Sequence, residues 1–444
     1  MKLWSKSGNI NQQIESFTVG MDRELDLLLA QHDVIGSIAH VHMLKHVGLM
    51  DDSEETMLIK GLKAVLVTIE NGGFSIKDGI EDVHSQVEMI LTEKIGEVGK
   101  KLHTARSRND QVLLDLRLFF RSTIQEVHEL VVPLIQTFLS QADQFKNYFI
   151  PGYTHMQVAM PSSFGLWYGA YAEALIDDLN LMEDVYDLLN QNPLGSAAGY
   201  GSSFPIDRQK TTDLLGFKSL CVNSIFAQMG RGKSEWHFAN MIASIAMTLN
   251  KFAMDVTLYS SQNFAFLTLP DAFTTGSSIM PHKKNPDVFE LIRAKCGKLM
   301  GLPNQVQLMI HNLPSGYHRD FQVLKEIIFP AIVELKDCLS ITSECLPQIK
   351  HEENILDEEK YDLAFTVETV NALVQSGMPF RDAYHEVARL VKNDTFSPNK
   401  NLNHSHIGSI GHLGLDLIEE KLEANRLGKK MEKVRGKIDA LVGG

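Results

Sequence analysis

Long stretches of the chain place apolar residues at intervals of three, four and seven positions, and few stretches alternate apolar with polar residues. This spacing is typical of one face of an α-helix. The clearest example is residues 164–191, where Trp167, Tyr171, Leu175 and Met182 follow one another at such steps. A helix of this length extends about 40 Å at about 1.5 Å per residue. The pattern therefore predicts a mainly α chain built on long rods.

Four further segments carry the same periodicity. They span residues 111–145, 235–264, 287–311 and 325–345, and Pro133 is expected to kink the first of them. Because apolar residues cover more than one side of several of these helices, each is expected to pack against several neighbours. Five rods indicate an elongated helical bundle. The spacing alone leaves open whether the neighbours belong to other subunits or to one large monomer.

Shorter patterns flank the rods. Residues 1–105 contain short helical segments and a Gly-rich turn at 71–73, and polar Asn and Ser clusters occupy 397–409. We therefore predict an N-terminal helical domain over 1–105, a central long-helix bundle over 106–355 and a C-terminal helical domain over 356–444. The expected architecture is an elongated central bundle flanked by two smaller helical domains.

Composition narrows the class of protein. The chain has 444 residues, 44% of them hydrophobic, which is enough for sizeable cores, and a formal net charge of −13. That charge opposes non-specific binding to nucleic acid or to an anionic membrane. No run approaches the roughly 18–20 apolar residues that span a bilayer, and no apolar signal core follows the first residues. The four cysteines form no Cys-x-x-Cys pair, so we expect a protein of the reducing cytoplasm.

Residues 276–290 combine Gly, Ser, Lys, Pro and Asn in one short stretch. Gly276 lets the backbone turn so that amides near Ser277 and Ser278 can converge on one negatively charged oxygen, and Lys283 can add a positive charge. A hydroxyl held there could ionise and act as a strong base. The alternative is an ordinary polar surface loop, because the same residue types form turns.

This stretch resembles the G-S-S-x-M-P-x-K-x-N motif of the fumarase/aspartase superfamily. Segments 101–111, 151–157 and 313–322 further resemble the argininosuccinate lyase family, and the similarity extends from about residue 20 to 390 in the family's order. The resemblance implies a homotetramer with a central helical bundle and active sites shared between subunits. It also implies cofactor-independent, reversible elimination of argininosuccinate to arginine and fumarate, as in arginine biosynthesis.

The resemblance assigns the chemistry to a few side chains. It makes Ser277 the base, Lys283 and Asn285 the support for the substrate carboxylate, and His155 the proton donor or its relay. Glu290 would orient this histidine. Without the motifs, the histidine would read as a surface or packing residue and the glutamate as a solvated side chain near a helix start. Which of the adjacent serines ionises stays open.

Substrate binding is assigned to polar and charged side chains from several segments. They are Ser107, Arg108, Asn109, Thr154, Asn285, Tyr317, Gln322, Lys325, Asp82 and His84. A guanidinium can bind a carboxylate through two parallel hydrogen bonds, and the resemblance places Tyr317, Gln322 and Lys325 on the arginine half of the substrate. Taken alone, the same residues could be a solvated charge cluster and ordinary loop and helix positions. No metal or organic cofactor is expected, and no His-Glu-x-x-His pair is present.

The chain departs from the family pattern over residues 223–238, which are longer and lack two aspartates, and this leaves the role of Arg231 undetermined. His282 also replaces the usual Gln. Residues 227–234 match a relaxed phosphate-loop pattern, which would fit a P-loop NTPase if that loop followed a buried strand. The sequence is also compatible with a different fumarate-releasing lyase, of the adenylosuccinate lyase or fumarase type, and with a crystallin-like structural protein.

Overall fold

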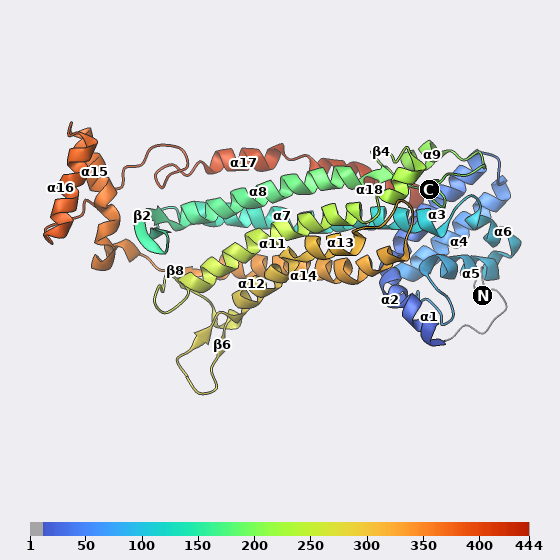
Figure 1. Cartoon of the computed structure of the whole chain (residues 1–444), viewed down its shortest axis with the longest axis horizontal. Helices are drawn as coiled ribbons and strands as arrows, with labels where there is room; N and C mark the ends of the chain where they lie inside the picture. The colour runs from blue at the N-terminus through green and yellow to red at the C-terminus, as the bar shows by residue number, and fades with distance from the viewer. Residues whose placement is uncertain (1–11, 444) are drawn as a thin grey trace.

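The computed structural model describes residues 12–443 as an elongated, mainly helical molecule (Figure 1). Its long rods are α7 (Arg108–Gln144), α8 (Phe164–Leu189), α11 (Lys233–Tyr259), α12 (Asp287–Met300), α13 (Leu302–Ile310) and α14 (Val323–Cys345). The predicted mainly α fold is confirmed, and so are the predicted long helices. The segment expected as one helix over 287–311 is two helices, which meet at Gly301.

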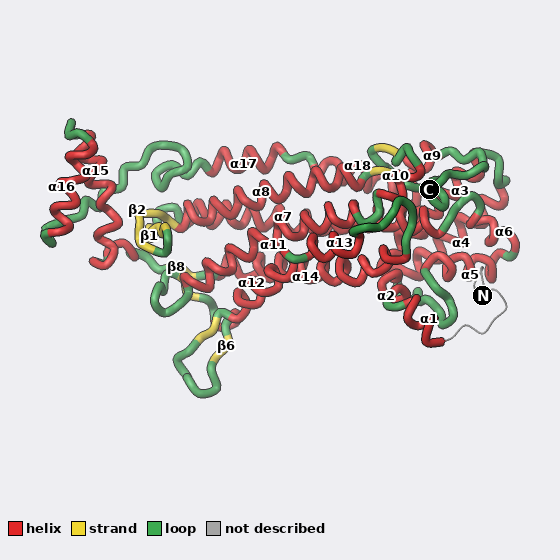
Figure 2. The backbone as a smooth tube through the Cα atoms, in the orientation of Figure 1, coloured by secondary structure: helices red, strands yellow, loops and turns green. Residues whose placement is uncertain are grey.

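The rods lie side by side along the long axis because each buries an apolar stripe in one shared core (Figure 2). Phe120 of α7 stacks on Phe238 of α11 with ring centroids 4.4 Å apart, and Phe138 meets Phe252 edge to face at 5.0 Å. α7 continues through Pro133 as a single helix. The bundle core is therefore continuous over much of the length of the molecule.

A second core holds the N-terminal helices at one end of the bundle. Val34, Leu62 and Val87 are fully buried there, against Leu114 of α7. The elements at this end are α1 (Gln12–Val19), α2 (Asp22–Asp26), η1 (Leu27–Leu29), α3 (Ala30–His46), α4 (Asp52–Glu70), α5 (Val83–Ile95), α6 (Glu97–Lys100), η2 (Lys101–His103), α9 (Arg208–Leu214) and α10 (Ser224–Met229). The start of α7 runs into this core, so the two cores share one helix.

The strands are short and form four pairs. The longest pair is the antiparallel hairpin of β1 (Phe149–Thr154) and β2 (Gln157–Ser163). The other pairs are β3 (Gln191–Asn192) with β4 (Ser219–Leu220), β5 (Leu267–Thr268) with β8 (Lys350–His351), and β6 (Thr275–Gly276) with β7 (Lys284–Asn285). These pairs close loops between helices, and two of them carry predicted catalytic residues.

The chain after residue 345 reaches one end of the molecule and then returns. Its elements are η5 (Leu346–Gln348), η6 (Ile355–Asp357), η7 (Glu359–Phe365), α15 (Thr366–Gln375), α16 (Phe380–Lys392), α17 (Leu415–Ala424) and α18 (Leu427–Gly443); η3 (Asp271–Phe273) and η4 (Arg319–Gln322) precede them. Figure 1 shows α15 and α16 at the end opposite the N-terminal helices, whereas α17 and α18 run back along α8. Leu441 of α18 joins the N-terminal core. The division at residues 105 and 355 stays a prediction.

One helical stretch, Ser224–Tyr259, is long and apolar enough to cross a membrane when judged by length and composition alone. Half of its most apolar window is buried inside the protein. Such burial is typical of a core helix in a helical bundle, and α11 contributes Phe238, Ile242 and Leu249 to the bundle core.

Candidate active site

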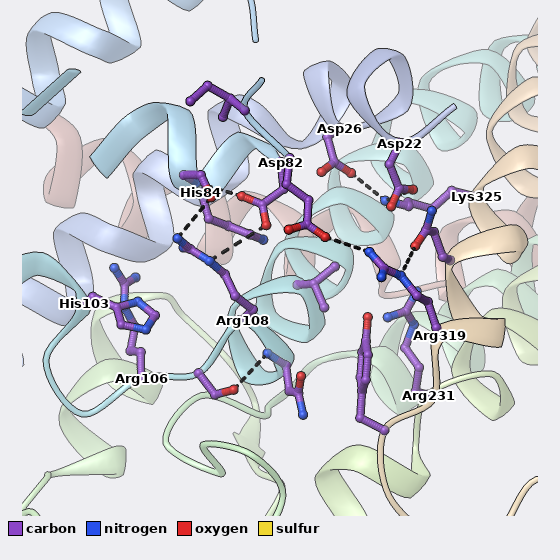
Figure 3. Close-up of a pocket in the computed structure, with 18 of the residues that line it drawn as sticks. Asp22, Asp26, Asp82, His84, His103, Arg106, Arg108, Arg231, Arg319 and Lys325 are labelled. Carbon is purple, nitrogen blue, oxygen red and sulfur yellow. Dashed lines mark hydrogen bonds and ion pairs between the residues drawn. The ribbon is translucent and has the colours of Figure 1, made fainter. Parts of the chain in front are cut away.

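A cavity of about 610 Å³ lies where the N-terminal helices meet the bundle (Figure 3). Its walls come from α2, the start of α5, the start of α7 and the segment around η4. It brings together most of the predicted substrate-binding residues, namely Asp82, His84, Ser107, Arg108, Asn109, Tyr317, Gln322 and Lys325. Residues far apart in the sequence therefore converge on one site.

Two helix N-termini open onto this cavity. Asp82 caps α5 by accepting the Ser85 N–H at 2.7 Å, and Ser107 caps α7 by accepting the Asn109 N–H at 3.2 Å. Because free N–H groups and the helix dipole both favour negative charge, the two ends suit an anionic ligand. Arg108 donates to Glu88 Oε2 at 3.2 Å, so part of its charge is already matched within the protein.

His84 places a positive charge in the wall of the cavity at neutral pH. Its Nδ1 lies 2.8 Å from Asp33 Oδ1 and 3.5 Å from Asp115 Oδ2, and all three side chains are buried. Burial alone would lower the pKa of His84, but the negative charges of Asp33 and Asp115 raise it to about 9. Their ligand atoms lie within 4.8 Å of one another, as in a metal site. A metal ion there would have to displace the proton on His84. We therefore interpret the cluster as an arrangement in which the neighbouring aspartates keep the imidazolium charged.

Lys325 is held by two carboxylates that the motifs did not reveal. Its Nζ lies 2.5 Å from Asp26 Oδ1 and 2.7 Å from Asp22 Oδ1, with the lysine side chain almost wholly buried. Burial raises the pKa of Asp22 to about 6, against the lowering effect of the Lys325 ammonium. The resemblance places Lys325 on the arginine half of the substrate, and that role stays a prediction; in the structure its charge is already matched by two carboxylates of the protein. A spacing of four residues between Asp22 and Asp26 on one helix face was the available signal.

One residue of the atypical segment 223–238, Arg231, lines the cavity. Arg231 lies between Glu235, at 2.5 Å, and the carbonyl of Phe321, at 2.9 Å, and its Nη1 has no hydrogen-bond partner among residues 12–443. Arg319 binds Glu81 at 2.6 Å. Both guanidinium groups lie beside the cavity in Figure 3, and sequence reasoning assigned neither of them a role.

The phosphate-loop alternative does not meet its structural condition. The matching residues 227–234 run from α10 into α11, and no buried strand precedes them. The hydroxyl of Ser234 is buried and donates to the carbonyl of Gly230 at 2.6 Å. This segment is a junction between two helices rather than a loop between a buried strand and a helix.

His155 and Thr154 lie away from the cavity, at the tip of the β1–β2 hairpin. His155 and Met156 form the two-residue turn, and both have positive φ, 53° and 61°. The two side chains and that of Thr154 are exposed, and 65% of Met156 is accessible to solvent. The hairpin therefore presents its histidine outward at the far end of the bundle (Figure 1).

Ser277 lies in a separate loop between β6 and β7, which projects from the side of the bundle (Figure 1). Its Oγ accepts the N–H groups of Ile279 at 3.3 Å and Met280 at 3.1 Å. These amides are positioned to stabilise negative charge on this oxygen. Lys283 is exposed in the same loop, whereas Asn285 lies at its base and donates to Thr275 Oγ1 at 3.5 Å.

Glu290 begins the helix after this loop, on the first turn of α12. Its carboxylate lies 3.9 Å from Arg293 Nη2, and within residues 12–443 no hydrogen bond or ion pair joins it to His155. The predicted catalytic groups thus occupy two exposed places, and most of the predicted binding groups occupy a third. Thr154 and Asn285, which were predicted to bind substrate, lie with the catalytic groups instead. One chain alone brings most of the binding residues together and leaves the catalytic residues apart.

Comparison with known proteins identifies relatives of this chain. A protein-family profile described as Lyase matches residues 4–301. The argininosuccinate lyase of Parabacteroides distasonis is 57% identical over 412 residues, covering 93% of this chain and 92% of the relative. Among solved structures, a variant of EDDS lyase with bound fumarate has a TM-score of 0.79 at 21% identity and 98% and 95% coverage. The class II fumarase of Schistosoma mansoni has a TM-score of 0.70 at 15% identity, with 96% and 94% coverage.

Proposed function

The chain belongs to the argininosuccinate lyase family, and we propose that it converts argininosuccinate to arginine and fumarate at a site completed by neighbouring subunits. The observation that carries this proposal is the charged cavity between α2, α5 and α7. Argininosuccinate has three carboxylates, an ammonium and a guanidinium, so its pocket needs placed charges of both signs. This cavity has Arg, Lys and His charges alongside Asp and Glu.

The cavity is suited to hold the arginine half of the substrate. Asp22 and Asp26 face Lys325 and offer carboxylate oxygens to a cationic group, whereas Arg231 has an unused N–H for a carboxylate. The imidazolium of His84 adds positive charge without depending on pH near neutrality. Because most of these groups are buried and already paired, they are ordered before the substrate arrives, which lowers the entropy cost of binding.

Ser277 is proposed to remove the proton from the carbon next to a succinyl carboxylate. The electron pair left on that carbon forms the double bond of fumarate as the bond to the arginine nitrogen breaks, and His155 supplies the proton that this nitrogen takes up. The amides of Ile279 and Met280 stabilise negative charge on the serine oxygen, and Lys283 stabilises the charge that gathers on the carboxylate. No cofactor takes part in this scheme.

This chemistry requires the exposed loops to be covered. A serine hydroxyl that is exposed to water stays protonated near neutral pH. A general base needs a pKa matched to its task and a site from which water is excluded. The residues beside the two catalytic loops are apolar and open to solvent: Ile279 is 83% and Met156 is 65% exposed. Such side chains are typical of surfaces that another chain covers.

The sides of the bundle show the same property. Several large apolar side chains of the long helices point into solvent, including Met247 at 59%, Leu291 at 60%, Leu308 at 64% and Val333 at 53% exposed. We propose that they lie in the interfaces of a homotetramer that shares its active sites between subunits. The proposed location is the cytoplasm, with neither nucleic acid nor a membrane as a partner.

A substrate panel tests the proposal. Fumarate release is followed by ultraviolet absorbance from purified protein given argininosuccinate, adenylosuccinate, malate or aspartate, with arginine measured as the second product. We expect turnover of argininosuccinate alone. Turnover of another substrate instead would keep the elimination chemistry and overturn the proposed specificity, and silence on all four would favour a structural role of the crystallin kind.

A further inference from the structure

A second cavity, of about 120 Å³, lies between α3, α7, α8 and α18. His32, Arg121, Tyr186 and Arg435 contribute to its lining, one from each of these helices. Its walls are built almost entirely from residues separate from those of the larger cavity between α2, α5 and α7. It therefore joins the N-terminal helices, the bundle and the last helix of the chain at one point.

Arg121 is the unusual feature of this cavity. The residue is only 4% exposed, and its Nη1 and Nη2 donate to Asn190 Oδ1 at 2.9 Å and to the Leu215 carbonyl at 3.0 Å. Both acceptors are neutral, and among residues 12–443 no carboxylate forms an ion pair with this guanidinium. Its Nε has no hydrogen-bond partner there either. The other face of the group stacks over the Phe217 ring at 4.2 Å.

A buried charge without a counter-charge is unfavourable, and arginine cannot escape the problem by losing its proton in the way that lysine can. Burial does lower the pKa of Arg121, to about 10, but the group stays charged at neutral pH. Arg231, which is buried to a similar degree, has Glu235 at 2.5 Å. Arg117 is also buried without an ion pair among residues 12–443, but only Arg121 of the two lines this cavity. Arg121 therefore combines an unmatched buried charge with space for a ligand beside it.

The neighbouring groups line the cavity with polar atoms. His32 is buried, its Nε2 lies 3.1 Å from Ser122 Oγ, and burial lowers its pKa to about 4, so it borders the cavity as a neutral imidazole and adds no charge. Tyr186 contributes the wall from α8. Ser122 and Arg435 are exposed and lie at the same cavity, so an ion can enter from solvent. Arg435 and Gln125, which both line the cavity, each donate to Glu129 Oε1 at 2.9 Å.

We infer that this cavity binds one small oxyanion of the inorganic phosphate or sulfate class, with Arg121 as its main ligand. The cavity volume of about 120 Å³ is enough for one such ion. Because α18 supplies one wall, the bound ion ties the last helix of the chain to α3, α7 and α8. The ion raises the stability of the folded protein by mass action.

Inorganic phosphate is the probe for the test. The full-length protein is titrated with phosphate at constant ionic strength, held with gluconate, a monovalent carboxylate. Melting temperature is followed by calorimetry and direct binding by isothermal titration. We expect a saturable rise in melting temperature, with phosphate affinity at least about tenfold weaker in Arg121→Gln because a charge-assisted hydrogen bond and the ion's counter-charge are lost.

If Arg121→Gln fails to fold, two variants of exposed residues on one helix, Arg435→Gln and Lys433→Gln, still test the inference. Arg435→Gln removes a charge at the mouth and should weaken binding about threefold, as expected for an exposed charge. Lys433→Gln removes the same charge from the same helix but does not line the cavity, so it should bind phosphate as the wild type does. Equal binding by Arg435→Gln and wild type would overturn the inference, as would the absence of saturable binding.

The larger cavity also carries positive side chains, and Arg108→Gln separates the two sites. Binding that survives Arg108→Gln and is lost in Arg121→Gln supports the inferred site. Binding that is lost in Arg108→Gln and survives in Arg121→Gln contradicts it.

Discussion

The cavity between α2, α5 and α7 and the two catalytic loops differ in how complete they are within one chain. In the cavity, Lys325 has two carboxylates within 2.7 Å and His84 is buried against Asp33. In the loops, His155 and Ile279 are exposed, and residues 12–443 provide no ion pair for Lys283. The difference shows that the fold of one chain can preorganise the binding residues. The proposed chemistry, in contrast, needs a second chain to exclude water from the catalytic loops.

The largest effect is expected from the loop that carries the base. Ser277→Ala should lower kcat by about 10³-fold, because a positioned base is lost, while substrate affinity and the fold are retained. Steady-state fumarate release and isothermal titration with argininosuccinate check the two parts. Ser278→Ala is the matched control and should keep most of the activity. If the effects of the two variants are exchanged, Ser278 is the base, and near-normal turnover in both would exclude the loop from the chemistry.

In the cavity, a substitution is expected to lower the stability of the folded protein. Lys325→Met leaves Asp22 and Asp26 as buried carboxylates without a counter-charge, and we expect the free energy of unfolding to fall by about 3–5 kcal/mol at pH 7. Urea denaturation measures this. Lys336→Met is the control on the same helix, because its ion pair with Glu126 is at the surface and should contribute at most about 1 kcal/mol. Equal effects of the two changes would mean that the Lys325 pairs are not stabilising.

The His84 cluster makes the stability of the folded protein depend on pH. The pKa of His84 is about 9 in the folded protein against its usual 6.5, so its contribution, about 3 kcal/mol, is complete below pH 6.5 and is lost as pH rises toward 9. Urea midpoints should therefore fall between pH 7 and pH 9. His84→Gln should flatten this part of the profile. A slope unchanged by that substitution would assign the titration to another group.

The smallest effect concerns the bundle surface. Met247→Ser changes a side chain that is 59% exposed in one chain, so in a monomer it should alter stability by less than about 0.5 kcal/mol. If α11 lies in a subunit interface, the change should instead weaken association by about 1–2 kcal/mol per subunit. Sedimentation across a range of protein concentrations measures this. Val67→Ser, on the outer side of α4 and 54% exposed, is the control and should not affect association.

Much of the fold follows from the sequence because helical periodicity is a local property. Residues 164–191 and 325–345 have nearly the observed ends, since apolar spacing and caps such as Ser163 act within a few residues. The break at Gly301 was not predicted, because the apolar spacing continues across it.

The candidate site was less accessible to prediction. Motifs pointed to Arg108, Tyr317 and Lys325, which do line one cavity. They gave no sign of Asp22 and Asp26, because the partner of a buried lysine is set by tertiary packing rather than by local sequence. The spacing of residues in the sequence also could not show that His155 and Ser277 lie away from that cavity, because their positions depend on the path of the whole chain.

The central claim is that the cavity of one chain works with the catalytic loop of another, and subunit mixing tests it most directly. Ser277→Ala carries a defective loop and an intact cavity, and Arg108→Gln carries the reverse. Each variant alone should release little fumarate from argininosuccinate. After denaturation and joint refolding, mixed assemblies should regain activity, because some sites then combine an intact cavity with an intact loop. Continued inactivity in assemblies that native mass spectrometry shows to contain both variants would contradict the account.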